Sequence, residues 1–205
     1  MKSDVLLNIA ATMAHSRANG PGLRAVVWVQ GCTIGCPGCY NAFTHPHEQS
    51  SLTSPEHVAN WVASLEGIEG VSFSGGEPFE QARAVLSTIR AIRKLSPNLT
   101  FFSYSGYDLH ILQASEDPHV LDLLAELDML SAGPYVHEKR SQELLWRGSS
   151  NQRLHYLTDA YSSENETHWR TNSPVEEFTL SDGSIQFSGF GGPGSKILRM
   201  LSSKL

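Results

Sequence analysis

The sequence predicts an α/β fold, a partial (βα) barrel with parallel strands that is followed by a C-terminal β-hairpin and a short helix. Two observations support this prediction. Short β-branched or aromatic runs alternate with amphipathic segments of helical period, and an Asp-Gly pair joins two alternating segments near the C-terminus. Strands that alternate with helices form right-handed βαβ units around a parallel sheet.

Four predicted strands alternate with three predicted helices. The strands are residues 25–29 (AVVWV), 70–78 (GVSFSGGEP, ending at its two glycines), 99–107 (LTFFSYSGY) and 129–133 (MLSAG). The helices are residues 54–65, 79–95 and 119–128. Ser54 is the expected N-cap of the first helix, because Pro55 at the first helical position has a backbone angle that suits a helix start. We expect four or more parallel strands.

The alternation of strands and helices ends after Gly133. Residues 134–153 are expected to form a loop-rich functional segment, and residues 158–174 are polar enough for an exposed linker. We therefore divide the chain into a core of residues 1–157 and a tail of residues 158–205. The tail holds the linker, the hairpin and a C-terminal helix, all packed on the same domain.

The hairpin turn is predicted at Asp182-Gly183, because this pair favours the tight two-residue turns that join antiparallel strands. The resulting register pairs apolar residues on one face: Phe178 with Phe187, and Leu180 with Ile185. We expect this face to be buried against the core.

Composition argues against two classes of partner. The 205 residues carry a formal net charge of −6, and no run of Lys or Arg forms a stripe that could track a phosphate backbone. No segment is long and apolar enough to cross a bilayer, and the apolar run within residues 1–17 is too short and interrupted for a secretory signal. We therefore expect a cytoplasmic protein that binds neither nucleic acid nor membranes.

All three cysteines of the chain, Cys32, Cys36 and Cys39, lie in one loop directly after the first predicted strand. In the cytoplasm thiols stay reduced, so this odd, clustered set is not a disulfide framework. The spacing lets three thiolates converge on one metal centre. Three glycines give the loop the backbone freedom to wrap around it: Gly31, Gly35 and Gly38.

Two metal centres fit these thiols. A structural zinc ion would take a fourth ligand from His45 or His47, which follow closely in the sequence. A cubane iron–sulfur cluster would instead use three thiolates on three irons and leave the fourth iron open to a substrate or cofactor. A third interpretation, in which the cysteines are merely small buried side chains, fits the regular spacing least.

The unusual segments of the sequence follow the ends of the predicted strands. The cysteine loop follows the first strand, and SGGEP, SYSGY and SAGP end the next three. Because the carboxyl ends of parallel strands meet at the same edge of a sheet, we expect all four segments to lie on one rim. That rim is the predicted active face.

These motifs together resemble a known family. The spacing Cys-x3-Cys-x2-Cys and the SGGEP segment are similar to the two signature motifs of radical S-adenosylmethionine enzymes. Four further segments look like those of the anaerobic ribonucleotide-reductase activating proteins: GPGLR (20–24), VQGC…GCYN (29–41), SGY (105–107) and WRGSSNQR (146–153). The resemblance covers residues 20–157 and favours the iron–sulfur cluster over zinc.

The resemblance implies roles for the first two motifs. Cys32, Cys36 and Cys39 would bind three irons of a [4Fe-4S] cluster, while the amino and carboxylate groups of S-adenosylmethionine would chelate the fourth. The segment after the second strand would bring backbone carbonyls to the methionine amino group, since a Cβ at either glycine would hold the chain away. Its candidate cofactor-binding residues are Gly75, Gly76, Glu77 and Pro78.

Further cofactor-binding candidates come from the other motifs. Tyr40 and Asn41 adjoin the cluster and could stack on adenine or bond the backbone, although packing alone would also explain Tyr40. Ser103 and Ser105 could bond the ribose or the carboxylate, or simply end a strand. Arg147 could meet the cofactor carboxylate or an acidic partner, or lie on the surface.

The predicted function is the reductive cleavage of S-adenosylmethionine at a [4Fe-4S] cluster, which yields a 5′-deoxyadenosyl radical for hydrogen abstraction. The most specific version installs a glycyl radical on a partner protein and takes electrons from a donor such as flavodoxin or ferredoxin. An alternative is the radical modification of a peptide or small metabolite. Ala132 favours this alternative, because the activators usually have Asp before the glycine, and so does the long tail. A non-catalytic zinc or iron–sulfur binding module is a rival of a different class.

Overall fold

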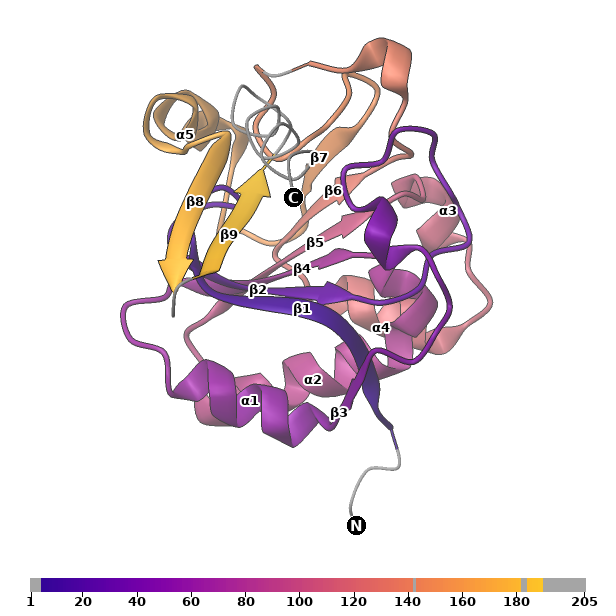
Figure 1. Ribbon diagram of the computed structural model, residues 1–205, viewed down its shortest axis with the longest axis vertical. Helices are drawn as coiled ribbons and strands as arrows, with labels where there is room; N and C mark the ends of the chain where they lie inside the picture. The colour runs from indigo at the N-terminus through magenta and orange to yellow at the C-terminus, as the bar shows by residue number, and fades with distance from the viewer. Residues whose placement is uncertain (1–4, 142, 182–183, 190–205) are drawn as a thin grey trace.

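The computed structural model describes residues 5–141, 143–181 and 184–189. Its main sheet has seven strands in the order β3-β1-β2-β4-β5-β6-β7, of which β2, β4, β5 and β6 run parallel (Figure 1). The strands are β1 (Leu7–Ser16), β2 (Arg24–Val29), β3 (Ser51–Thr53), β4 (Gly70–Gly75), β5 (Thr100–Ser105), β6 (Met129–Ala132) and β7 (Arg153–Tyr156). The predicted α/β class and the four parallel strands are confirmed, and the sheet stays open between its edges β3 and β7.

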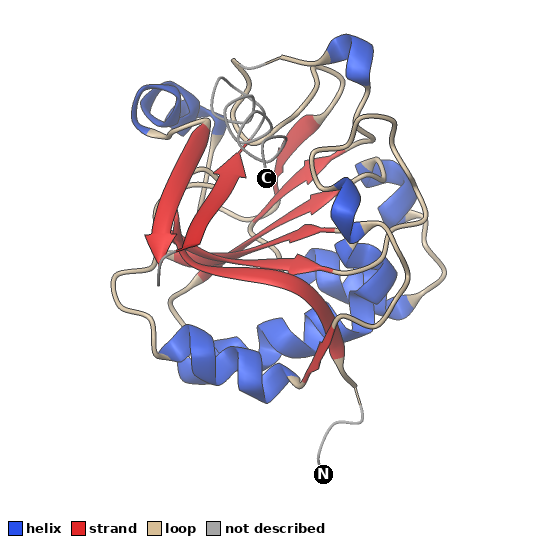
Figure 2. Ribbon diagram, viewed as in Figure 1, coloured by secondary structure: helices blue, strands red, loops and turns tan. Residues whose placement is uncertain are grey.

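The helices are α1 (Pro55–Ala63), α2 (Ala82–Leu95), α3 (Leu109–Gln113), α4 (Pro118–Glu126) and α5 (Glu166–Asn172), with short 3-10 turns η1 (Ala42–Thr44), η2 (Pro78–Gln81), η3 (His137–Lys139) and η4 (Ser163–Asn165). Helices α1, α2 and α4 cover one face of the sheet, whereas α5 lies on the other, as Figure 2 shows in blue. The predicted cap of α1 is confirmed, since the Ser54 hydroxyl accepts the His57 amide proton. The apolar side of α2 packs on the sheet because Val85, Ile89 and Ile92 recur at helical spacing and are fully buried.

The N-terminal strand β1 is not among the predicted elements, which begin at Ala25. It pairs antiparallel with β2 and extends the sheet toward the short edge strand β3. Its register shifts twice, between Ile9 and Ala11 and again between Met13 and Ser16. Such bulges break the period-2 alternation by which a strand is recognised in a sequence. The segment after Gly133 is loop-rich as predicted, but it ends in β7, which pairs antiparallel with β6.

The prediction of an exposed linker at residues 158–174 is wrong for its second half. Helix α5 forms there, and its Trp169 is buried in an aromatic cluster with Phe102, Met129 and Trp146 on the sheet face away from α1, α2 and α4. One buried indole among polar neighbours is enough to fix a short helix, because a single large aromatic removes so much apolar surface from water.

The C-terminal hairpin is confirmed in its strands and register. β8 (Glu176–Ser181) and β9 (Ser184–Gly189) form a separate two-stranded sheet whose register pairs Phe178 with Phe187 and Leu180 with Ile185. The turn at residues 182–183 and the expected C-terminal helix lie outside the described residues. The prediction that the phenylalanine face is buried is wrong at Phe178, which is 49% exposed.

Polar residues on the opposite face attach the hairpin to the core instead. The Glu177 carboxylate accepts hydrogen bonds from the Ser16 hydroxyl and, at 2.9 Å, from the Arg17 amide. On the paired strand, the buried Ser188 hydroxyl accepts from the Asn19 side-chain amide at 2.5 Å. Because neighbouring residues of a strand face opposite sides, docking through these polar side chains turns Phe178 toward solvent.

No helix in the described part of the chain has both the length and the apolar character that a membrane span requires.

We propose that the described part of the tail folds as part of the same domain as the core. Trp169→Ala should then lower the free energy of unfolding of the whole protein by about 3–5 kcal/mol, because it empties a packed aromatic site. The measurement is urea unfolding followed by circular dichroism. Phe178→Ala, at the exposed position of the same tail, is the matched control and should cost about 0.5 kcal/mol or less. A separate early transition in the Trp169→Ala protein, with the main transition unchanged, would contradict a single domain.

Candidate active site

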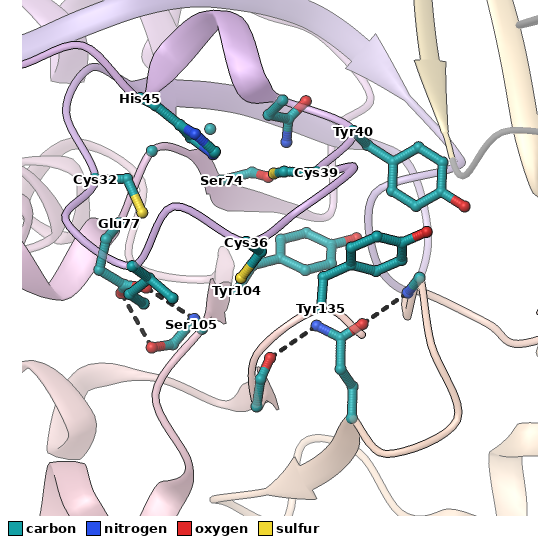
Figure 3. A pocket seen from close by; sticks show the side chains of 18 residues that line it. Cys32, Cys36, Cys39, Tyr40, His45, Ser74, Glu77, Tyr104, Ser105 and Tyr135 are labelled. Carbon is teal, nitrogen blue, oxygen red and sulfur yellow. Dashed lines mark hydrogen bonds between the residues drawn. The ribbon is translucent and has the colours of Figure 1, made fainter. Parts of the chain in front are cut away.

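One pocket, open to solvent, lies at the carboxyl ends of β2, β4, β5 and β6 (Figure 3). The structure confirms the predicted rim, because each of the four expected segments contributes lining residues. From the cysteine loop come Cys32, Ile34, Cys36, Cys39, Tyr40, Asn41 and His45, from the loop after β4 Ser74, Gly75, Gly76 and Glu77, and from the later segments Tyr104, Ser105, Gly106, Gly133, Tyr135, Gly148 and Gln152.

The cysteine loop is closed on itself at its base. The Gly31 amide donates to the Thr44 carbonyl at 2.7 Å, and the Cys32 amide donates to the His45 carbonyl at 3.1 Å. The Thr44 side chain is fully buried and hydrogen-bonds within the loop, to the Asn41 carbonyl. These contacts make the loop a compact unit that carries all three half-buried thiols to the mouth of the pocket.

The two glycines after β4 let two loop backbones touch. The Gly76 amide donates to the Val29 carbonyl and the Glu77 amide to the Gly31 carbonyl, each at 2.8 Å. A Cβ on Gly76 would lie 2.1 Å from the Gly31 oxygen, and Gly75 has a positive φ of 94°. Both glycines line the pocket, where their approach to a cofactor stays a prediction, and their backbones also pack against the backbones of β2 and of the start of the cysteine loop.

Glu77 is buried and fully hydrogen-bonded. Its carboxylate accepts from the Phe79 amide and the Ser105 hydroxyl at 3.0 Å, and from the Gly106 amide at 2.8 Å. Burial raises the pKa of Glu77 to about 7, although these three hydrogen bonds oppose the shift. The Glu77 side chain therefore links the loop after β4 to the end of β5, and the Ser105 hydroxyl donates its proton to this carboxylate.

Three tyrosines form the other end of the pocket. The Tyr40 and Tyr135 rings meet edge to face with their centroids 5.2 Å apart, and Tyr104 comes from β5. Burial raises the pKa of Tyr40 to about 12, so its phenol stays protonated. A Cβ at Gly148 would lie 2.8 Å from the Tyr40 ring and 3.0 Å from the Tyr135 ring. Only glycine fits there without moving the two rings.

Gln152 holds the segment that carries Gly148. Its side-chain oxygen accepts from the Gly148 amide at 2.8 Å, and its side-chain nitrogen donates to the Gly133 carbonyl at 2.9 Å. Just before Gly148, Trp146 adopts a positive φ of 50°, which is unusual for a large residue. The WRGSSNQR motif thus supplies the far wall of the pocket through Gly148 and Gln152.

Most of the predicted cofactor-binding residues lie at the pocket, but three do not line it. Ser103 is fully buried within the sheet, and Pro78 is buried at the start of η2. Arg147 points toward α5, where it lies 3.9 Å from the Glu166 carboxylate and donates to the Leu145 carbonyl. The pocket is lined instead by the residues that adjoin these three in the chain: Glu77, Tyr104 and Gly148.

Period-2 alternation could have identified Tyr104 in advance. Phe101 and Phe102 belong to clusters on opposite faces of the sheet, so Ser103 shares the helix-covered face with Phe101, whereas Tyr104 shares the open face with Phe102. Tyr135 and Gln152 had no comparable signal, because they lie in irregular backbone.

The donor set suits a cluster better than one ion. The described residues contain no group of three or more Cys, His, Asp or Glu side chains that could hold a single metal ion. A zinc site needs its ligands within about 2.3 Å of one point, whereas a cubane binds each thiolate at a different corner. His47 does not line the pocket, and its imidazole lies 3.7 Å from the Glu80 carboxylate. Burial raises the pKa of the Cys32 and Cys39 thiols, so without metal these thiols ionise less readily than an exposed cysteine does.

This fold and three-cysteine pocket fit an iron–sulfur protein. A family described as "4Fe-4S single cluster domain" matches residues 18–155. The chain belongs to this family, within the radical S-adenosylmethionine enzymes, whose cofactors are a [4Fe-4S] cluster and S-adenosylmethionine.

Its relatives are proteins named "anaerobic ribonucleoside-triphosphate reductase-activating protein". Those of Salmonella typhimurium and Vibrio cholerae are 33% identical over 145 and 146 residues, each match covering 68% of this chain and 92% of the relative. The Escherichia coli K12 relative is 32% identical over 145 residues, with the same coverage. The crystal structure of QueE from Escherichia coli matches with a TM-score of 0.35 and 15% identity over 50% of this chain and 52% of that one, a likeness too slight to define the fold.

Burial of Glu77 gives the protein without metal a specific pH dependence. The folded-state pKa of about 7 lies above the ordinary value of 4.5, so stability from neutral Glu77 is full below pH 4.5 and is lost as pH rises through 7. We expect a loss of about 3 kcal/mol from this group across that interval. The measurement is urea unfolding at several pH values for the wild type and for Glu77→Gln, which cannot titrate. Parallel curves for the two proteins would contradict the shift.

Proposed function

We propose that this protein is an activating enzyme that uses a [4Fe-4S] cluster and S-adenosylmethionine to form a glycyl radical on a partner protein. The observation that carries the proposal is one pocket in which Cys32, Cys36 and Cys39 meet the glycine turn of β4. The names of the relatives support it as well, because they describe proteins that activate an anaerobic reductase.

The cysteine loop would hold the cluster at the pocket by the thiolates of Cys32, Cys36 and Cys39. When bound, the cluster supplies one electron to S-adenosylmethionine, whose sulfonium carbon–sulfur bond breaks to give methionine and a 5′-deoxyadenosyl radical that removes a hydrogen atom. The protein's part is to position and enclose this chemistry.

The residues divide the pocket between these tasks. Ser74 and the backbone of the β4 turn lie beside the cysteine loop, where polar groups of the methionine part could bind. Glu77 fixes that turn through its three hydrogen bonds rather than through contact with the cofactor. The three tyrosines at the far end exclude water and offer flat apolar surfaces to the adenosyl group or the substrate.

The charge of the pocket favours a peptide substrate over an anionic metabolite. Among the described residues that line the pocket, none is Lys or Arg, and Glu77 is the acidic member. A phosphorylated metabolite would need cationic or multiple N–H donors to replace its hydration. A glycine-containing peptide loop is neutral and narrow, so it requires no such charges.

The electron would come from a donor such as flavodoxin or ferredoxin. The three thiols are free, and a centre bound by reduced thiols fits the reducing cytoplasm, the compartment expected from the sequence.

The decisive experiment combines the anaerobically reconstituted protein with S-adenosylmethionine, a one-electron reductant and the anaerobic ribonucleotide reductase of the same organism. We expect 5′-deoxyadenosine, methionine and a glycyl-radical signal in electron paramagnetic resonance spectra of the reductase. Release of 5′-deoxyadenosine with no radical on the reductase would indicate that the substrate is another peptide. No cleavage by an iron-loaded protein would defeat the enzyme proposal itself.

Individual replacement of the three cysteines tests the ligand set. Cys32→Ala, Cys36→Ala and Cys39→Ala should each lower the iron content of the reconstituted protein from about four per chain to near zero, because a cubane needs all three thiolates. His45→Gln is the matched control at the same pocket and should keep its iron. Stoichiometric zinc in the wild type that is lost in His45→Gln would instead support a Cys3His site.

A further inference from the structure

Glu80 connects three parts of the molecule around the cysteine loop. It lies on η2, and its side chain is 17% exposed. The carboxylate accepts from the Thr33 amide at 3.0 and 3.1 Å and also from the Thr33 hydroxyl. The Tyr107 hydroxyl, just beyond β5, donates to the same carboxylate at 3.1 Å. No sequence motif singled out this residue.

These contacts hold the backbone on both sides of Cys32. The Cys32 amide is bound to the His45 carbonyl, and the next amide along the chain, that of Thr33, is bound to Glu80. Two consecutive amides with fixed partners leave the peptide units around Cys32 little freedom to rotate. Cys39 differs, because its amide bonds only within the loop, to the Cys36 carbonyl.

We propose that Glu80 is a positioning residue that fixes Cys32 at the pocket and adds a negative charge beside the bound cluster. The effect of the charge on the cluster rests on the proposed function, whereas the anchoring of the loop does not. Hydrogen bonds to a charged acceptor are worth roughly twice those between neutral groups, so the carboxylate is a strong anchor for an exposed loop residue such as Thr33.

The negative charge has its own consequence for the cluster. Reduction adds an electron to a centre that already carries thiolate charge, and a nearby carboxylate opposes that addition. Glu80 therefore makes the cluster a stronger reductant once it is reduced. Its removal should raise the midpoint potential, an effect that a purely structural residue would not produce.

The anchoring is tested first on the protein without metal, by hydrogen–deuterium exchange of peptides that cover residues 32–45. Glu80→Ala should increase exchange in this loop by roughly tenfold or more, and Glu80→Gln by less, because the amide keeps one acceptor. Glu69→Gln is the matched control: Glu69 accepts the Leu23 amide at 2.9 Å at the opposite end of β4, and its loss should leave loop exchange unchanged. Wild-type exchange in both Glu80 variants would overturn the anchor.

The charge is tested on the reconstituted protein, by a redox titration followed by electron paramagnetic resonance. Glu80→Gln should shift the midpoint potential to a less negative value, whereas Thr33→Val, which removes only the hydroxyl donor, should not. An unchanged potential in Glu80→Gln overturns the electrostatic role. If the wild type binds no cluster, the proposed function fails, and the exchange experiment still decides the anchor.

Discussion

The contact between two loop backbones, Gly31 and Gly76, is the constraint on which the site depends. The Gly31 oxygen lies where a Cβ on Gly76 would be, and the adjoining amides donate to the carbonyls of Val29 and Gly31. The end of β2 and the end of β4 are thereby joined beyond the sheet, where strand pairing no longer holds them. Glu77 extends this junction to β5, and Glu80 extends it to the cysteine loop. A side chain at Gly76 would push the two loop backbones apart.

Element order was enough to predict the active face, because parallel strands carry their following loops to one edge. Cys32 and Glu77 could be placed there before any coordinates were known. Contacts between loops could not be predicted in the same way. The steric role of Gly76 depends on which backbone lies opposite, and Tyr135 lies in irregular backbone with no period to reveal its direction.

In the tail, a difference of one residue position decides which face of the hairpin docks on the core. The register of the hairpin followed from its turn, but the face that docks did not follow from hydrophobicity. Glu177 and Ser188 meet buried polar partners at Ser16 and Asn19, and those hydrogen bonds decide the orientation over the burial of Phe178. Arg147 shows a similar shift of one residue, since its neighbour Gly148 lines the pocket. Sequence patterns locate such segments well. Which of two adjacent residues points toward the core or the pocket depends on the residues that the segment packs against.

The backbone at Trp146 is strained, and the free energy that holds it in place comes partly from contacts with the tail. A non-glycine residue at φ 50° costs about 1–3 kcal/mol, and packing must hold it there. The Trp169 indole, 5.2 Å from that of Trp146, supplies part of this packing from a helix beyond the matched family region of residues 18–155. Local unfolding of α5 would remove this packing and let the backbone at Trp146 relax, and Gly148, two residues further on, packs against the Tyr40 and Tyr135 rings without spare room. We therefore expect unfolding of the extension to disturb the far wall of the pocket.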